Sequence, residues 1–129
     1  MIYTVTLPAQ AAAGADAVVV AGVYSQAFYS GDTVTDLQLV VPAGYPTTTG
    51  GATNNATVSV RQLRLGVPVA TLGTLTLGAG ITLSAETAVT IPVGAQQILQ
   101  PGDILDVQLH QNGAGQAIPA GLMVSTFVS

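Results

Sequence analysis

The residues best suited to acid–base or metal chemistry lie around the single histidine of the chain. His110 shares a face of one predicted strand with Asp106 and Gln108, because alternate residues of a strand point to the same side. A histidine and a carboxylate can move protons, but a catalytic metal usually needs three protein ligands, and only Asp103 lies nearby as a further acid. No serine stands in a Gly-x-Ser-x-Gly elbow. We therefore expect His110 to be a surface or subunit-contact residue without a metal.

The other carboxylates give no catalytic pattern either. Asp32 and Thr33 match the start of an aspartic-protease loop, but Val34 stands where that turn requires glycine. Carboxylate pairs for glycoside hydrolysis need sugar-stacking aromatics, and this chain has no tryptophan and 5% aromatic residues. Asp32 and Asp103 are better interpreted as turn residues. Because the chain also lacks cysteine and lysine, we expect no enzymatic activity and no cofactor.

The two arginines are the only cations of the side chains, and they flank a predicted irregularity. Alternation along Ala56–Leu65 places Val58 and Val60 inward and then Leu63 and Leu65, so the inward phase slips by one residue around Arg61–Gln62. A β-bulge there would restore the register. Two interpretations of the arginines remain open. Each fork binds a carboxylate on an adjacent strand, or each reaches a carboxylate of a neighbouring subunit.

Composition excludes several classes of protein. Charged residues make up 6% of the 129 residues and hydrophobic residues 49%, which is unlike a disordered chain. The net charge is −4, so no basic patch exists to bind nucleic acid. We expect no export signal and no membrane partner, since the most apolar segment, Ala17–Tyr24, is far shorter than a bilayer span.

The elements that must position these residues are short strands. Apolar and polar residues alternate with period two along most of the chain, and glycine and proline interrupt them at short intervals. We expect one domain over residues 1–129, in which Ala17–Tyr24 is buried on both faces and Tyr45–Asn55 is a long exposed, mobile loop. The predicted strands cover Tyr3–Leu7, Ala17–Tyr24, Leu37–Val41, Ala56–Leu65, Val67–Leu77, Ile81–Leu83, Thr87–Val93, Leu105–His110 and Leu122–Val128.

Eight or nine short antiparallel strands in a small domain indicate an all-β sandwich. The simplest arrangement is a jelly roll, and an immunoglobulin-like sandwich is the alternative. No repeat of 20 to 50 residues occurs, so a solenoid or propeller is unsupported.

The shortage of charge predicts permanent assembly. Edge strands of monomers are commonly guarded by lysine or other charges, and this chain has no lysine. Its outward positions are mostly Thr, Ala, Gln and Ser, which cost little to desolvate. Such a surface suits burial against other chains.

The chain resembles the capsid decoration, or cement, proteins of tailed bacteriophages. The likeness rests on the lysine-free and cysteine-free composition and on the closing passage Pro101–Val107 through Ile118–Leu122. The resemblance implies a homotrimer, made in the host cytoplasm, that binds the major capsid protein on the outside of the virion and bridges capsomers.

The resemblance also implies that an N-terminal arm, here residues 1–14, grips the shell. Tyr3, Val5 and Leu7 alternate as in a strand, so the arm can add to the edge of another sheet. We therefore expect Tyr3, Val5, Leu7, Arg61 and Arg64 to contact the capsid or another subunit.

A head-fibre, tail or baseplate module that binds host glycans is the alternative function. It requires a surface cluster of aromatic residues, and Tyr24, Phe28, Tyr29 and Tyr45 are the candidates. A small hydrolase that uses His110 with Asp106 is a third hypothesis.

Overall fold

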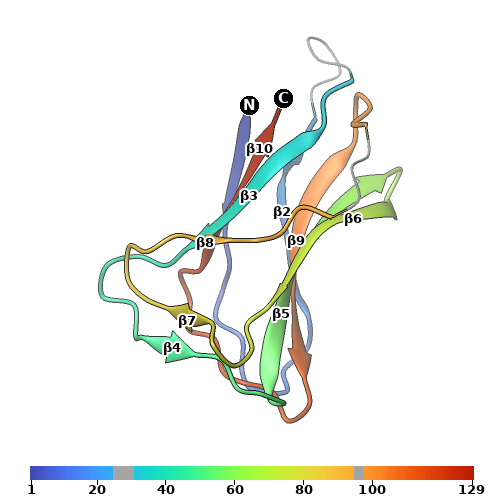
Figure 1. Cartoon of the computed structure of the whole chain (residues 1–129). Helices are drawn as coiled ribbons and strands as arrows, with labels where there is room; N and C mark the ends of the chain where they lie inside the picture. Colours follow the sequence, from blue (N-terminus) through green and yellow to red (C-terminus); the bar gives the residue numbers. More distant parts are fainter. Residues whose placement is uncertain (25–30, 95–97) are drawn as a thin grey trace.

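Strands make up all of the regular structure in the part of the chain that is described. The computed structural model describes residues 1–24, 31–94 and 98–129, and within these ranges it contains no helix, so none that could cross a membrane (Figure 1). The all-β prediction is therefore confirmed. The strands are β1 (Ile2–Thr6), β2 (Ala17–Val23), β3 (Val34–Val40), β4 (Thr48–Thr49), β5 (Asn55–Arg64), β6 (Val67–Thr76), β7 (Thr82–Leu83), β8 (Val89–Thr90), β9 (Ile104–Asn112) and β10 (Met123–Val128).

The strands form two four-stranded antiparallel sheets and a small ribbon. One sheet has the order β1-β10-β3-β8 and the other the order β2-β9-β5-β6, while β4 pairs with β7. The two larger sheets lie in separate layers (Figure 1), so the predicted antiparallel β-sandwich is confirmed.

The strand pairs are nested. β1 pairs with β10, β2 with β9, β3 with β8, β4 with β7 and β5 with β6. This is the order obtained when one long ribbon, with its turn between β5 and β6, is rolled across two layers. The two ends of the chain meet as a result, since the amino group of Met1 donates to the carbonyl of Val128 at 2.9 Å.

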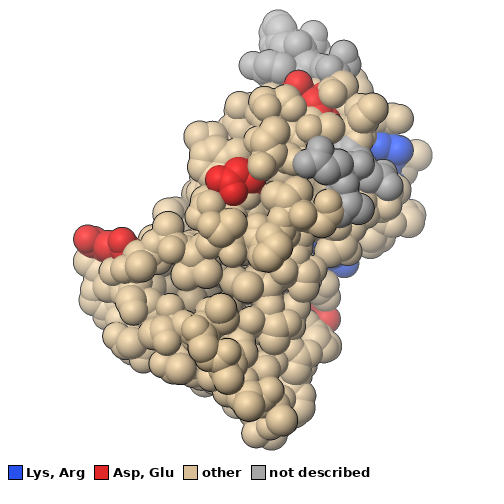
Figure 2. Space-filling model, viewed as in Figure 1, with Lys and Arg blue, Asp and Glu red and all other residues tan. Residues whose placement is uncertain are grey.

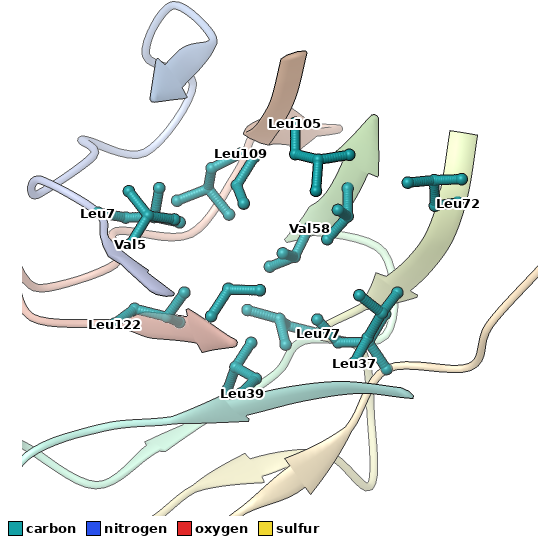
Figure 3. Close-up of a cluster of buried hydrophobic side chains, with 14 of the residues drawn as sticks. Val5, Leu7, Leu37, Leu39, Val58, Leu72, Leu77, Leu105, Leu109 and Leu122 are labelled. Atoms are coloured by element: carbon teal, nitrogen blue, oxygen red, sulfur yellow. The ribbon is translucent and has the colours of Figure 1, made fainter. Parts of the chain in front are cut away.

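The core lies between the sheets and consists of the inward residues of each alternation. Leu37 and Leu39 of β3 face Val58 of β5 and Leu105 and Leu109 of β9 (Figure 3). Each of these side chains is fully buried, and burial of a leucine or valine contributes roughly 1.5–3 kcal/mol. The period-two pattern therefore identifies most of the core directly from the sequence.

The expectation that Ala17–Tyr24 is buried on both faces is wrong for β2. Val18, Val20 and Val23 are 48%, 60% and 52% exposed. Each sheet of a two-layer sandwich turns one face to solvent, and Val18, Val20 and Val23 lie on that face of β2. A continuous apolar run does not reveal that one side of the strand is turned to solvent.

The predicted irregularity at Arg61–Gln62 is confirmed, but its form differs. The β5–β6 register shifts between Val60 and Arg61 and again two residues later, and the extra residues, Leu72 and Val69, belong to β6. The alternation of β5 is unbroken, so the fully buried residue is Gln62. The prediction of inward side chains at 63 and 65 is wrong, because Leu63 is only half-buried and Leu65 is 97% exposed.

The segment Tyr45–Asn55 is only in part the exposed loop expected from its composition, since Pro46, Thr47, Thr49 and residues 52–54 are exposed but both ends are buried. Tyr45 is 6% exposed and donates a hydrogen bond to the carbonyl of Pro119 at 2.8 Å. Asn55 is also buried. At Gly50 the backbone packs so closely on Leu77 that a Cβ atom would lie 2.0 Å from the carbonyl oxygen. Both ends of the segment and its middle are thus held by the sandwich.

Candidate assembly surface

The N-terminal residues proposed as an arm form an edge strand of the chain's own sheet. Tyr3 pairs with Thr126 and Val5 with Val124 of β10, and the amide of Leu7 donates to the carbonyl of Leu122 at 2.7 Å. Val5 is 9% exposed and Leu7 1%, so both belong to the core (Figure 3). The residues of β1 available to a partner are therefore those of the opposite face.

Glutamines fasten the segment that follows β1. Gln10 is buried, and its Nε2 donates to the carbonyls of Ala15 and Leu109 at 2.9 and 2.8 Å. Its Oε1 accepts a 2.7 Å hydrogen bond from Gln111, and its backbone exchanges two hydrogen bonds with Ile118. Residues 1–14 are thus integrated into the fold, and no sequence motif revealed the two glutamines that secure them.

Tyr3 closes the seam between β1 and β2, the edge strands on one side of the sandwich. Its ring packs so closely on Gly22 that a Cβ atom at that position would lie 2.5 Å from a ring carbon. Its hydroxyl donates to the carbonyl of Val23 at 3.3 Å. We call the solvent-facing side of these two strands the open edge. Its apolar residues are Ile2, Val18, Val20 and Val23.

Arg61 forms an internal ion pair on the outer face of the β2-β9-β5-β6 sheet. Its Nε and Nη2 donate to the two carboxylate oxygens of Asp106 on β9 at 2.9 and 2.7 Å. These hydrogen bonds raise the pKa of the Arg61 guanidinium. Asp106 is nearly fully buried by this contact, which makes it unavailable to His110.

Arg64 forms a second internal pair with Asp103, which is 1% exposed. The carboxylate accepts two hydrogen bonds from Arg64, both of 2.9 Å, one from Gln62 at 2.7 Å and one from the Gln100 amide at 2.8 Å. Burial raises the pKa of Asp103, but the hydrogen bonds outweigh it and hold the pKa below its ordinary value. The structure therefore shows the internal interpretation of both arginines. Asp103 anchors a buried network, a role that the sequence did not reveal.

His110 pairs with Asp16 rather than Asp106. Its Nδ1 lies 2.6 Å from Asp16 Oδ1, and Gln108 donates to the other oxygen at 2.7 Å. The hydrogen bond with His110 lowers the pKa of Asp16. Both side chains are well exposed on the outer side of the β2-β9-β5-β6 sheet. Among residues 1–24, 31–94 and 98–129, no group of three or more His, Cys, Asp or Glu side chains could hold a metal.

The aromatic cluster required for glycan binding does not form from the tyrosines that are described. Tyr24 is fully buried and donates to Asp32 Oδ2 at 2.7 Å, while Tyr45 is buried against Pro119. Burial raises the pKa of both phenols. Phe28 and Tyr29 lie outside the described residues. Neither Tyr24 nor Tyr45 presents a ring on which a sugar could stack.

Two further apolar features lie on the surface. The turn between β5 and β6 exposes Leu65 and Val67, which are 97% and 60% accessible. At the end of β3 and the start of β10 there is an open hollow of about 530 Å³. Figure 2 shows how few charged groups interrupt one face of the molecule. The residues that line the hollow are Thr6, Val40, Val41, Pro42, Ala43, Glu86, Gly121 and Met123.

Comparisons with known proteins define no family for this chain. No family model matches it, and no curated protein matches it. Among solved structures it is similar to a chain in a structure of infectious bursal disease virus, strain Gx, with a TM-score of 0.42 and 14% identity. That match covers 98% of this chain, which spans about a third (31%) of the other chain's length.

Proposed function

We propose that this protein is a structural, non-enzymatic component of a virus particle. In this role it is a homotrimer that decorates the outside of a tailed-phage capsid and stabilises contacts between the subunits of the major capsid protein. The resemblance noted from the sequence leads to this role, and the surface of the sandwich supports it. A head-fibre or tail module is less favoured because Tyr24 and Tyr45 are buried.

The open edge is the observation that carries the proposal. β2 presents three exposed valines and pairs with another strand on one side only, and it has no lysine or proline to block further pairing. Natural proteins usually protect such an edge, since it promotes association with other strands. Both arginines are paired with acids within the chain, so neither of them guards the edge as a free cation. A protein partner that covers β1 and β2 accounts for this surface.

Strand addition is the mechanism that fits the open edge. A strand of the capsid protein that adds to the edge strand β2 would extend its sheet and bring partner side chains beside Val18 and Val20. In this proposal the outward residues of β1, rather than the buried Val5 and Leu7, contact the shell. Residues 1–14, which are integrated into the fold, then provide an edge strand of the sandwich rather than a separate arm.

The nested strand order supports the jelly-roll form of the sandwich. A jelly roll places its first and last strands side by side, and here β1 pairs with β10. An immunoglobulin-like sandwich instead pairs its first two strands in one sheet, whereas β1 and β2 lie in different sheets. Jelly rolls occur in viral capsid proteins but also in lectins and cupins, so the surface and not the fold decides the function.

The absence of enzymatic activity is part of the proposal. The His110–Asp16 pair lies on the exposed face of a sheet, and the hollow lies on the opposite sheet. No proton-transfer group other than Glu86 lines the hollow. The His110–Asp16 pair therefore cannot act on a molecule bound in the hollow, which supports a non-enzymatic role.

Purified particles test the proposed location. Particles are isolated on a density gradient from cells that produce this protein, and an antibody against the protein is added to intact particles. We expect the protein to band with the particles in a constant ratio and the antibody to label them without disruption. Absence from the particles, or labelling only after they are opened, would contradict the outer-surface role.

A further inference from the structure

The β5–β6 turn carries a leucine where the backbone disfavours one. Leu65 and Gly66 have φ values of 52° and 79°, and Arg64 pairs directly with Val67, so these two residues form a two-residue turn. Turns with positive φ at both central positions favour Asn-Gly or Asp-Gly. Leucine is strained in this region and is also 97% exposed. The fold therefore gives no reason for an apolar side chain at this position.

The hollow has the complementary character. It is lined mainly by Val40, Pro42, Ala43 and Met123, which come from the end of β3 and the start of β10. Its volume of about 530 Å³ falls in the range of roughly 300–1,000 Å³ typical of sites that enclose apolar ligands, which is ample for a leucine side chain. The turn lies on the right in Figure 1 and the end of β3 on the left, so one molecule cannot fill its own hollow.

Charge at the two features is also complementary. Arg64, next to the turn, uses Nε and Nη2 on Asp103, and Nη1 has no hydrogen bond within the described residues. Its side chain is 34% exposed. Glu86 lines the hollow, and its carboxylate is exposed without a partner within those same residues. A guanidinium beside the leucine would therefore approach a carboxylate beside the hollow.

We propose that Leu65 of one subunit inserts into the hollow of a second copy of this chain. This inference rests on the proposed function, because it supplies the contact that builds the trimer. The contact joins two different surfaces, so it is head-to-tail, and such contacts close into a ring when the rotation between subunits allows it. Three subunits linked in this way leave each open edge available for the shell.

Disulfide trapping tests the contact directly, because the chain has no cysteine of its own. The double variant Leu65→Cys/Val40→Cys is oxidised and run on a non-reducing gel. We expect covalent species of up to three chains, since each bond must form between subunits. The matched double variant Leu65→Cys/Val20→Cys, whose second site is exposed on β2, is expected to remain uncross-linked.

The variant Leu65→Asn provides a second readout. Asparagine tolerates positive φ, so this change keeps the turn and removes only the apolar side chain. We expect subunit association to weaken by about tenfold or more, as burial of a leucine corresponds to roughly 1.5–3 kcal/mol.

The outcomes separate this inference from the proposed function. An oligomeric wild-type protein that shows no Leu65–Val40 cross-link and is unaffected by Leu65→Asn would overturn the insertion and leave the virion role standing. Cross-linked ladders beyond three chains would support the insertion but contradict the trimer. A monomeric wild-type protein at micromolar concentration would overturn both the insertion and the trimer.

Discussion

At the scale of single residues, both arginines of this protein pair with buried carboxylates of the same chain. Asp103 and Asp106 each bind one arginine through two hydrogen bonds, and both carboxylates are buried. When a buried carboxylate loses its charge, the charge of its partner is left unpaired. The free-energy cost of that unpaired charge exceeds the net stabilisation that the intact pair provides. The arginines are therefore structural residues of the β5–β9 layer.

Asp103→Asn is expected to lower the free energy of unfolding by about 1.5–3 kcal/mol, because it weakens the charge-assisted hydrogen bonds that the buried carboxylate accepts from Arg64 and Gln62. Chemical denaturation of the variant and the wild-type protein measures this difference. Ala79→Ser, at an exposed turn residue without a polar partner, is the matched control and is expected to change stability by less than about 0.5 kcal/mol. A loss as small as the control's would contradict the anchoring role of Asp103.

The pH dependence of stability follows from the lowered pKa of Asp103. The folded-state pKa lies below the ordinary value of 3.8, so the stabilisation is complete above about pH 4 and is lost as pH falls through the folded-state pKa. Unfolding midpoints measured from pH 6 downward should therefore decrease at the acid end. Asp103→Asn should reduce that slope, and an unchanged slope would contradict the assignment.

Leu65→Asn is expected to raise the free energy of unfolding by about 1 kcal/mol, because it relieves the strain of a leucine at positive φ. Denaturation below the concentration at which subunits associate isolates this effect. The same change is expected to weaken assembly, so stability and association should move in opposite directions. A loss of stability would show that Leu65 is needed by the fold itself.

At the scale of elements, the sequence predicts strands better than their positions in the sheets. Alternation places Leu37 and Leu39, or Leu105 and Val107, on the core side because the period of a strand is two. It does not reveal an outward apolar residue, since an outward valine and an inward valine look alike in the sequence, and β2 was misinterpreted for this reason. Gln62 was missed because a polar residue was not expected at an inward position, where its side chain donates to Asp103, which is 41 residues away.

The candidate site was predictable only in part. Pairing of each arginine with an internal acid was one of two open interpretations, and the identity of the acids depends on the register of β5 with β9. Tyr3, Val5 and Leu7 were identified as a strand, but hydrogen bonds to β10 make that strand part of this sandwich. Contacts between distant segments carry this information, and local patterns do not contain it.

The anchoring of β1 makes a clear prediction. Leu7→Ala is expected to destabilise the protein by about 2–5 kcal/mol, because it leaves a cavity at a fully buried position. Ile2→Thr, at a position 59% exposed on the same segment, is expected to cost less than about 0.5 kcal/mol. Thermal or chemical unfolding compares them. Equal, small effects would indicate that the segment is a detachable arm.

At the scale of the whole molecule, the surface combines an apolar edge, an apolar turn and an apolar hollow with very little charge. A monomer with 6% charged residues and no lysine has few means of preventing association. In the proposed assembly the turn and hollow join subunits, and the open edge faces the shell. Each apolar feature is then covered by protein.

A charge placed on the open edge should weaken binding to the shell and leave the contact between subunits unchanged. Val20→Lys is expected to reduce the amount of protein that bands with particles by about tenfold or more, because the lysine would have to be buried or would block strand pairing. The subunit mass should stay unchanged. Ala79→Lys adds the same charge at an exposed turn and should band normally. Normal banding of Val20→Lys would contradict the role of the open edge.

The central claim, that the missing charge reflects permanent assembly, is tested most directly by the mass of the purified protein in solution. Light scattering at micromolar concentration and near-neutral pH gives this mass without labels. A homotrimer of 12.9 kDa chains predicts about 39 kDa. A stable mass of 12.9 kDa would show that the apolar surface is tolerated by a monomer, and would contradict the account.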